Sequence, residues 1–364
     1  MKILLLGATG SIGTQTIEVI KKLNYSLVGI SYCSNHTSAK KIIKNNHLKY
    51  YYCSSDCSKS SVKNIDELIS LTNPDLVVNS VVGFAGLEST IKVLQHKKNI
   101  ALANKESLVV GGKLVMDLAK INNVNIYPID SEHTSLMQLV RKYQDDVDTL
   151  YITASGGRYY NWTKKQKELI KFEDAIKHPN WNMGAKISID SSTLMNKCFE
   201  IIEAYWYFSS KKIYALYHPQ SLIHSALKTK NNSYFCNMST VDMKLPIELA
   251  LTNFSTNVNV IKPLDFNNGI ILNLQNIDEN KHLPIKWAYD VIKNPNNLSL
   301  PIILNASNEI AIELFKDKKI KYTQIIEIIN WAIDNIKSSK ISTLEDIFKF
   351  DAKVRKIILE RWNK

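Results

Sequence analysis

The chain has 364 residues, of which 45% are hydrophobic and 22% charged, and its formal net charge is +12. This composition is ordinary for a globular enzyme of two or three domains, and no stretch approaches the roughly 18 uninterrupted apolar residues that a membrane span needs. The lysines are spread along the whole chain, so we expect no nucleic-acid partner and no membrane partner. Five scattered cysteines without a CxxC pair, and no leader before the first apolar run, predict a reduced, cytoplasmic protein.

The first third of the chain alternates short apolar segments with amphipathic ones. We predict strands at residues 2–6, 26–32, 75–79, 99–103 and 121–129, and helices at 11–23 and 87–96. Strands that alternate with helices are typical of a doubly wound parallel sheet. The last of these strands leads directly to Asp130.

The remainder of the chain changes character. A strand predicted at residues 150–155 opens into two glycines, and a polar, poorly periodic segment with tryptophans continues to about residue 184. Such segments inside compact domains are often lids over a site. A strong amphipathic helix is predicted at 196–208, an Asn-rich connection at 254–284, and only helices from about residue 283 onward.

A glycine motif, GATGSIG from Gly7, lies between the first predicted strand and the first predicted helix. Glycines there permit a tight turn and let the backbone approach a pyrophosphate, which then lies at the helix N-terminus. The alternative is a plain strand-to-helix turn. The position of the motif at the start of an alternating pattern favours a dinucleotide site.

The end of the second predicted strand indicates which dinucleotide binds. An NAD site usually places Asp or Glu there, to accept a hydrogen bond from the ribose. Here the sequence is YCSNHT from Tyr32, without a carboxylate, and Lys40 and Lys41 follow closely. A 2′-phosphate suits such a corner, so the sequence favours NADPH over NADH.

An acidic pair, Asp130 and Glu132, follows a predicted strand. On an extended chain, side chains at i and i+2 point to the same side. Two carboxylates held together need a cation or a shared proton, and hard oxygen ligands favour Mg²⁺ or Mn²⁺ over zinc. Alone, this pattern is more often an ordinary surface pair. A metal site needs a third carboxylate, for which Glu200 and Glu203 are the candidates.

A second polar cluster is predicted at the start of the helix 196–208. Hydroxyls, an amide, a lysine and free backbone N–H groups together bind phosphate well. The alternative is that the Ser and Thr residues only cap the helix, which would explain one hydroxyl but not the whole set. Glu200 lies three residues beyond Lys197 on nearly the same helical face, so one helix could hold a phosphate and a metal. The cluster consists of Ser191, Ser192, Thr193, Asn196 and Lys197.

Together these motifs resemble the 1-deoxy-D-xylulose-5-phosphate reductoisomerase family over essentially the whole chain. Their length and preserved order make a chance match very improbable. The resembling stretches are GATGSIGTQT from Gly7, ALANKESLV from Ala101, PIDSEH from Pro128, TASGG from Thr153, HPNWNMGAKISIDSSTLMNK from His178, HPQSLIHS from His218, DMKLPIELALT from Asp242 and LNASNEIAIELF from Leu304.

The resemblance implies an α/β fold with three domains. An N-terminal Rossmann-like NADPH-binding domain (1–129) precedes a central α/β catalytic domain (130–253) with a flexible flap at about 155–184. A linker (254–284) then leads to a C-terminal helical domain (285–364). The resemblance also implies a homodimeric enzyme that depends on NADPH and on Mg²⁺ or Mn²⁺. The reaction would convert a sugar phosphate, 1-deoxy-D-xylulose 5-phosphate, to 2-C-methyl-D-erythritol 4-phosphate in isoprenoid precursor biosynthesis.

The resemblance further implies roles for individual residues. The metal ligands would be Asp130, Glu132 and Glu200, which count as catalytic together with Lys105, His178 and His218. Substrate contacts would come from Ser131, Ser155, His178, Trp181, Met183, Ser191, Asn196 and Lys197, of which Trp181 and Met183 belong to the flap. The cofactor would contact Gly7, Thr9, Gly10, Ser11, Ile12, Gly13, Ser34, Asn35, Asn104, Lys105, Glu106 and Gly184.

Some features set this chain apart from the family pattern. Arg158 stands where the family usually has Pro, and Cys33 and Ser34 occupy a turn where the family often has Gly followed by Lys or Ser. Taken alone, His218 beside Pro219 would be a buried histidine bonded to backbone, and only its motif favours a catalytic role.

Two other functions fit parts of the sequence. One is a Rossmann-type dehydrogenase that acts on an amino-acid semialdehyde, and the other is a non-catalytic cofactor- or nucleic-acid-binding protein on the same scaffold. Neither needs three carboxylates around a metal.

Overall fold

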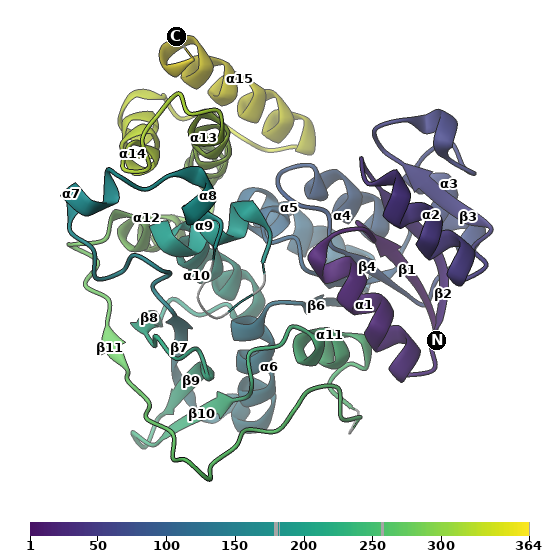
Figure 1. Ribbon diagram of the computed structural model, residues 1–364, viewed down its shortest axis with the longest axis horizontal. Coiled ribbons are helices and arrows are strands. Elements are labelled where there is room, and N and C mark those ends of the chain that lie inside the picture. Colours follow the sequence, from purple (N-terminus) through teal and green to yellow (C-terminus); the bar gives the residue numbers. More distant parts are fainter. Residues whose placement is uncertain (178–180, 182, 256–257, 364) are drawn as a thin grey trace. The chain divides into compact units, whose positions relative to one another are not determined.

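The structure is a computed structural model that describes residues 1–177, 181, 183–255 and 258–363 (Figure 1). The chain forms two compact units. The first comprises Met1–Ser107, Val115–Gln138 and Asp242–Leu264, and the second comprises Leu108–Leu114, Leu139–Val241 and Asp265–Lys364. The chain therefore passes from the first unit to the second and back more than once.

The first unit is built on a six-stranded sheet in which every pair of neighbouring strands is parallel. The strand order is β3-β2-β1-β4-β5-β6, the order of a doubly wound dinucleotide-binding sheet. The direction of the winding reverses between β1 and β4, where such folds place their ligand. The strands are β1 (Lys2–Leu6), β2 (Ser26–Tyr32), β3 (Tyr50–Cys53), β4 (Leu76–Asn79), β5 (Asn99–Leu102) and β6 (Ile126–Pro128).

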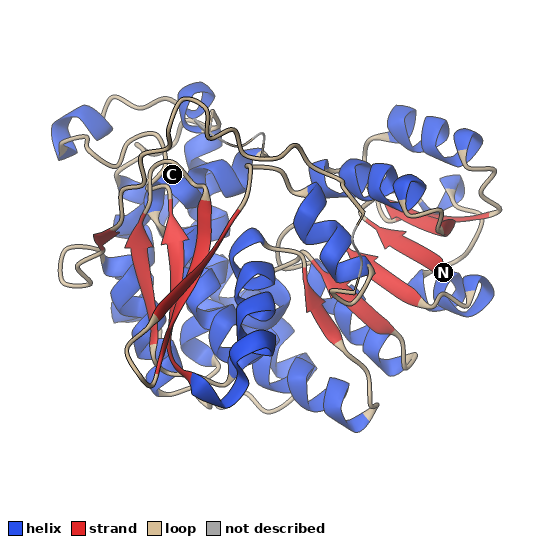
Figure 2. Ribbon diagram, turned by 90° about the horizontal axis from the view of Figure 1, so that it is seen from below, coloured by secondary structure: helices blue, strands red, loops and turns tan. Residues whose placement is uncertain are grey.

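Helices cover both faces of this sheet (Figure 2). They are α1 (Ser11–Lys22), α2 (His36–Asn45), α3 (Ile65–Thr72), α4 (Gly86–Gln95) and α11 (Lys244–Leu251), with a 3₁₀ turn η1 at Cys57–Lys59. Ile3 and Leu5 of β1 are fully buried in a core to which Ile247 of α11 also belongs. The returning segment 242–264 therefore completes the core of the first unit. Helices α5 (Glu106–Ile121) and α6 (Ser131–Tyr143) each have residues in both units.

The second unit is built on a mixed five-stranded sheet of order β10-β9-β7-β8-β11, in which β7 and β8 are parallel and the other pairs antiparallel. Its strands are β7 (Val147–Ala154), β8 (Ile213–Tyr217), β9 (Ile223–Thr229), β10 (Tyr234–Met238) and β11 (Gln275–Asn276). The remaining elements are η2 (Gln144–Asp146), α7 (Lys164–Lys167), α8 (Phe172–Ala175), α9 (Ala185–Thr193), α10 (Met195–Phe208), α12 (Leu283–Lys293), α13 (Ser299–Lys316), α14 (Gln324–Asn335) and α15 (Leu344–Trp362).

Helix α13 is the centre of the C-terminal helices. It packs against both α14 and α15, and most of its residues are buried, including the polar Asn305, Ser307 and Asn308. A helix that is apolar nearly all round lies inside a core. Helix α15 begins with a capping box in which Thr343 and Asp346 satisfy each other's backbone N–H groups.

The predicted fold class is confirmed, and most predicted elements of the first unit agree with the structure to within a residue or two. The strand predicted at 121–129 was too long, because α5 continues to Ile121 and β6 comprises only Ile126–Pro128. The boundaries of the functional domains stay a prediction. In the described part of the chain, no helix combines the length and the apolar character that a membrane crossing requires.

Candidate active site

The glycine turn joins β1 to α1 at the carboxyl edge of the parallel sheet. Gly7 has a left-handed φ of +83°, and a Cβ there would lie 2.7 Å from the carbonyl oxygen of Ser80. The N–H groups of Gly7 and Ala8 both donate to the Ser31 carbonyl, at 3.0 and 2.9 Å, which fastens the turn to β2. Gly10 is exposed, and a Cβ there would meet only the Gly7 carbonyl oxygen, at 3.5 Å. The turn is therefore rigid on its inner side and open at the N-terminus of α1, as a pyrophosphate requires.

The end of β2 carries no carboxylate. Cys33, Ser34 and Asn35 are exposed, and the Asn35 side-chain oxygen accepts from the Ser38 N–H at 3.1 Å as the N-cap of α2. One of the two predicted cofactor contacts at this turn is thus also a helix cap. Ser34 remains exposed to solvent at the sheet edge.

The segment 130–133 has a different conformation from the one predicted. Residues from Ser131 onward are helical, and Asp130 Oδ1 accepts from the N–H groups of Glu132 at 3.1 Å and His133 at 3.3 Å. The extended geometry inferred from the i, i+2 spacing was wrong, because the unsatisfied N–H groups of a helix start attract an acidic cap. Glu132 lies in the first turn of α6 and accepts from the Ser131 hydroxyl at 2.5 Å.

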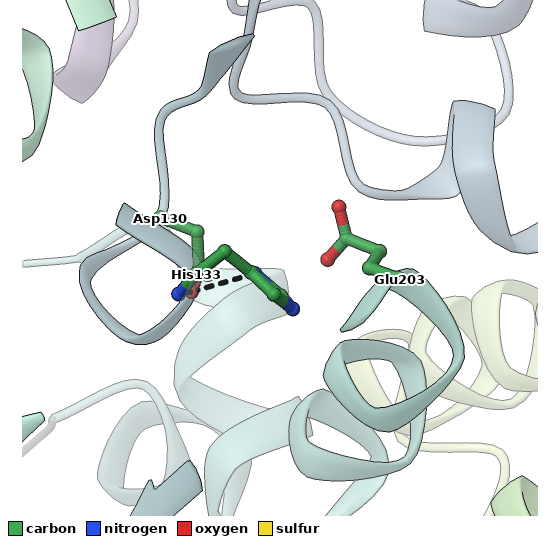
Figure 3. Close-up of side chains that lie close together, drawn as sticks. All are labelled: Asp130, His133 and Glu203. Atoms are coloured by element: carbon green, nitrogen blue, oxygen red, sulfur yellow. Dashed lines mark hydrogen bonds and ion pairs between the residues drawn. The ribbon is translucent and has the colours of Figure 1, made fainter. Parts of the chain in front are cut away.

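Asp130 is surrounded by cationic or potentially cationic groups of the first unit. Lys105 Nζ lies 3.2 Å from its Oδ2, and His133 Nδ1 lies 3.0 Å from its Oδ1 (Figure 3). His133 is fully buried. Sequence reasoning gave no role to His133, although it stands three residues after Asp130, on the same helical face. Lys105, which the family resemblance implies to be catalytic, lies beside Asp130, a predicted metal ligand.

Asn104 is buried and fastens the loop between β4 and α4. Its amide nitrogen donates to the carbonyls of Val81 and Gly83, both at 2.8 Å, and to Glu106 Oε2 at 3.0 Å. A Cβ on Gly86 would lie 2.2 Å from the Asn104 side chain, so this packing is close. Asn104 and Glu106 thus shape the carboxyl edge of the sheet near β5, where both were predicted to approach the cofactor.

Two helices of the second unit carry the predicted phosphate residues. Ser191 lies near the end of α9, and Leu194, with φ +64°, separates α9 from α10. The expectation that the Ser and Thr residues begin the following helix was therefore wrong. The hydroxyls of Ser192 and Thr193 instead donate to the Ile189 carbonyl and help to end α9.

The N-terminal part of α10 contains a buried ion pair. Asn196 and Lys197 each donate to a different oxygen of Glu200, and the side chains of Lys197 and Glu200 are 3% and 1% exposed. A buried ion pair is retained only when its partners are well hydrogen-bonded, as they are here. Glu203, one turn further along α10, is also buried and is labelled in Figure 3.

The loop after β7 packs against the end of α9. Gly156 and Gly157 both have left-handed φ angles, and a Cβ on Gly157 would lie 2.5 Å from the Ser192 Cα. The Gly157 N–H donates to the Ser155 hydroxyl at 3.1 Å. This close approach brings the predicted phosphate residue Ser155 to the same part of the unit as Ser191. Arg158, which replaces the family's Pro, is exposed.

His218 is fully buried, and both of its ring nitrogens contact backbone. Nε2 accepts from the N–H groups of Leu222 at 3.1 Å and Ile223 at 3.0 Å, and Nδ1 lies 2.8 Å from the Asn273 carbonyl. These partners assign the ring proton to Nδ1. His218 is thus a buried histidine bonded to backbone, as expected from its sequence position taken alone, and its catalytic role stays a prediction.

The predicted flap is only partly described. His178 lies outside the described residues. Trp181 is half-buried, with its ring 6.1 Å from that of His224, and Met183 is half-buried too. Gly184 is the N-cap of α9, and a Cβ on this residue would have no other atom within 4 Å.

The parallel sheet, its strand order and the open glycine turn define the class of the first unit, which is a dinucleotide-binding fold. Comparison with known proteins makes the assignment specific. Family models described as 1-deoxy-D-xylulose 5-phosphate reductoisomerase match residues 3–65 and 58–112, and those described as its C-terminal domains match residues 126–208 and 238–357.

Relatives that carry this name match along their full length. The reductoisomerase of Malacoplasma penetrans is 46% identical over 99% of this chain and 95% of its own, and that of Clostridium kluyveri is 37% identical over the whole of both. A crystal structure of the reductoisomerase with NADPH, fosmidomycin and magnesium superposes with a TM-score of 0.92, at 32% identity over 100% of this chain and 98% of the other. The Zymomonas mobilis enzyme in complex with NADPH gives 0.87 at 30% identity, over 99% and 98%. The chain belongs to the 1-deoxy-D-xylulose 5-phosphate reductoisomerase family.

Proposed function

We propose that this protein converts 1-deoxy-D-xylulose 5-phosphate to 2-C-methyl-D-erythritol 4-phosphate, with NADPH as reductant and a divalent metal ion. The observation that carries the proposal is the full-length likeness to reductoisomerases. The matched family models cover the glycine turn and the range 126–208, in which the three predicted metal-ligating carboxylates stand. The semialdehyde dehydrogenase and the non-catalytic binding protein receive no comparable support.

The chemistry of the donor set fits Mg²⁺ or Mn²⁺. Asp130 and Glu132 are half-buried, Glu200 is buried, and together they offer three hard oxygen ligands without sulfur. We assign the metal to these three residues, with Lys105 beside Asp130 to balance charge and to meet a substrate hydroxyl. When bound, the ion would supply Lewis-acid polarisation of the substrate ketone and a template for the rearrangement.

The phosphate of the substrate would bind where α9, α10 and the loop after β7 meet. Lys197 and Asn196 supply a cation and an amide, and Ser155 and Ser191 supply hydroxyls. The phosphate supplies binding energy remote from the reacting carbons. Ser131 would contact the substrate beside the metal ligands.

The flap residues His178, Trp181 and Met183 would close over the substrate and exclude water from the aldehyde that is reduced. His218, with both nitrogens on backbone, would hold the turn 218–223 in shape.

The turn between β1 and α1 fits the pyrophosphate of NADPH, since its glycines leave the N-terminus of α1 open. We assign this contact to Gly7, Thr9, Gly10, Ser11, Ile12 and Gly13. Ser34 and Asn35 would face the adenosine ribose, and Asn104, Glu106 and Gly184 the nicotinamide side. NADPH itself supplies the hydride.

We further propose that the protein is a cytoplasmic homodimer with no nucleic-acid or membrane partner, divided functionally at residues 129, 253 and 284. Light scattering tests the dimer directly, because the chain mass of 41.5 kDa would double. A mass of one chain at micromolar concentration would exclude it.

A turnover assay tests the function. Purified protein is mixed with 1-deoxy-D-xylulose 5-phosphate, NADPH and Mg²⁺, and the loss of NADPH absorbance is followed with and without a chelator. We expect oxidation that stops with the chelator and returns with excess Mg²⁺. Oxidation that is indifferent to the chelator, or that occurs only with an amino-acid semialdehyde, would exclude the proposal.

A further inference from the structure

The turn directly after β2, residues 33–35, carries no cation of the kind that usually accompanies a 2′-phosphate. In a doubly wound fold this corner receives the adenosine ribose, and its side chains decide between NAD and NADP. Ser34 is exposed and uncharged, and the Asn35 oxygen is used as a helix cap. Besides Lys40 and Lys41 in α2, a further element supplies a cation near this turn.

That element is η1, the 3₁₀ turn after the neighbouring strand β3. The Tyr32 hydroxyl at the end of β2 donates to the Lys59 carbonyl at 3.2 Å, which ties η1 to this corner. Lys59 Nζ lies 3.4 Å from His36 Nε2, in the first turn of α2. The ring of His36 stands edge-on to that of Tyr32, with centroids 5.8 Å apart. Lys59 and His36 therefore bring two nitrogen groups from different elements to the position next to Ser34 and Asn35.

The simplest alternative is that Lys59 only makes a surface ion pair with Asp56, at 3.0 Å. That pair is exposed, with side chains 49% and 36% accessible, and such pairs contribute little to stability. Asp56 also has partners other than Lys59, because its Oδ1 accepts from the Ser58 N–H at 3.1 Å and hydroxyl at 2.6 Å. The ammonium group can therefore turn to a stronger anion at small cost.

His36 supports the same interpretation. Its Nδ1 is buried and has no hydrogen-bond partner within the described residues, so the ring is held by packing and presents Nε2 to Lys59. A dianionic phosphate placed against Lys59 would also come within reach of this ring edge.

We propose that Lys59, with His36 beside it, binds the 2′-phosphate of NADPH and determines the preference for NADPH over NADH. This inference rests on the proposed function, because it assigns a part of the same cofactor site. In this assignment, η1 supplies a positive charge that residues 33–35, the turn after β2, do not carry.

Fluorescence titration of NADPH and NADH tests the assignment without turnover. In Lys59→Ala we expect the Kd for NADPH to rise about tenfold, because one charge-assisted contact is lost, and the Kd for NADH to stay unchanged. Lys59→Arg, which keeps the charge, should stay within a few-fold of the wild type. Lys49→Ala is the matched control. Lys49 directly precedes β3, at the end of that strand away from η1, and its ammonium lies over the Tyr50 ring.

An unchanged ratio of the two Kd values in Lys59→Ala, whether both stay the same or both rise equally, would overturn the assignment. That result would leave the proposed function intact if wild-type turnover with NADPH persists. A wild-type protein that binds NADPH no better than NADH would also overturn it.

Discussion

At the scale of single residues, α10 separates two carboxylates that sequence reasoning left as alternatives. Glu200 accepts from Asn196 and Lys197 in the first turn of the helix, whereas Glu203 lies one turn further along. Both are buried, so burial alone does not choose between them. The difference is in their neighbours, since Glu200 accepts hydrogen bonds from the predicted phosphate residues Asn196 and Lys197.

We expect Glu200→Gln to lower metal-dependent turnover more than about a hundredfold, because one of the three proposed metal ligands is lost. The Mg²⁺ concentration for half-maximal activity should rise as well. Glu203→Gln, an equally small change on the same helix, should have a much smaller effect. Metal titration of steady-state rates measures both, and a larger effect for Glu203→Gln would move the metal site to that residue.

Tyr322 has a role that its sequence context does not reveal. Its hydroxyl donates to the Ser192 hydroxyl at 2.8 Å, and Ser192 in turn donates to the Ile189 carbonyl at 2.9 Å. Burial raises the pKa of Tyr322 well above its usual range, so the hydroxyl remains a donor. Tyr322 thus fixes the end of α9, which carries Ser191.

We expect Tyr322→Phe to raise the KM for the sugar phosphate about fivefold with little change in kcat or in NADPH affinity, because one hydrogen bond that positions the phosphate residues is lost. Tyr159→Phe is the matched control. Tyr159 is buried in the same aromatic cluster, its ring 5.9 Å from that of Tyr322, and its hydroxyl has no hydrogen-bond partner in the part of the chain that is described. Equal effects of the two changes would show that packing alone is responsible.

At the scale of elements, the loop after β7 requires glycine for two reasons. Gly157 has φ +65°, and a Cβ there would come within 2.5 Å of the Ser192 backbone. Gly269 shares the first feature, with φ +70°, but has no atom within 4 Å of a Cβ position. The two glycines therefore separate the effect of backbone strain from that of a steric clash with Ser192, next to the predicted phosphate residue Ser191.

We expect Gly269→Ala to cost about 1 kcal/mol of stability and to leave the KM for the sugar phosphate unchanged. Gly157→Ala should lower the melting temperature further and raise that KM, because Ser155 and α9 must move apart. Thermal unfolding and steady-state kinetics on both variants give the comparison. Identical behaviour of the two would mean that the contact with Ser192 is unimportant.

The strand β7 is linked to both of its neighbouring strands by one partly exposed carboxylate. Asp148 pairs with Lys212, just before β8, at 2.7 Å and with Lys228 of β9 at 2.9 Å. Hydrogen bonds from Lys212 and Lys228 hold the pKa of Asp148 well below its usual range. A depressed carboxyl pKa contributes stability above the unfolded pKa of about 4, and this contribution is lost as the pH falls through the folded pKa.

Asp148→Asn should therefore be less stable than the wild type near pH 7, and the difference should shrink below about pH 4. High salt should also reduce this difference, since the ion pairs are accessible to solvent, with the Lys212 side chain 63% exposed. Denaturant unfolding at several pH values measures this, with Asp145→Asn as control, an exposed carboxylate for which no ion pair occurs among the described residues. A difference that is constant with pH would rule out the ion pairs as its cause.

The limits of sequence reasoning also appear at the scale of elements. Strands such as β1 and β2 were predictable because local apolar runs and the glycine turn determine them. The helical start at Ser131 was missed because an Asp before polar residues is compatible with both a cap and an extended strand end, and the choice depends on packing of α6. The contacts of His218 involve Asn273, 55 residues away, which no local pattern indicates. Likewise, the link from η1 to the end of β2 depends on the order of strands in the sheet.

At the scale of the whole molecule, the chain builds two compact units from segments that alternate along the sequence. The segment 242–264 returns to the first unit and completes its core through Ile247 and its neighbours. The predicted metal ligands likewise come from segments far apart in the sequence, with Asp130 and Glu132 at the start of α6 and Glu200 in α10.

The most direct test of the reaction is to follow the carbon skeleton. Carbon-13 NMR on labelled 1-deoxy-D-xylulose 5-phosphate, with NADPH and Mg²⁺, distinguishes rearrangement with reduction from simple reduction of the ketone. The proposed function predicts one equivalent of branched 2-C-methyl-D-erythritol 4-phosphate for each NADPH oxidised, and none with chelator. A linear reduced product, or NADPH oxidation without a branched carbon, would contradict it.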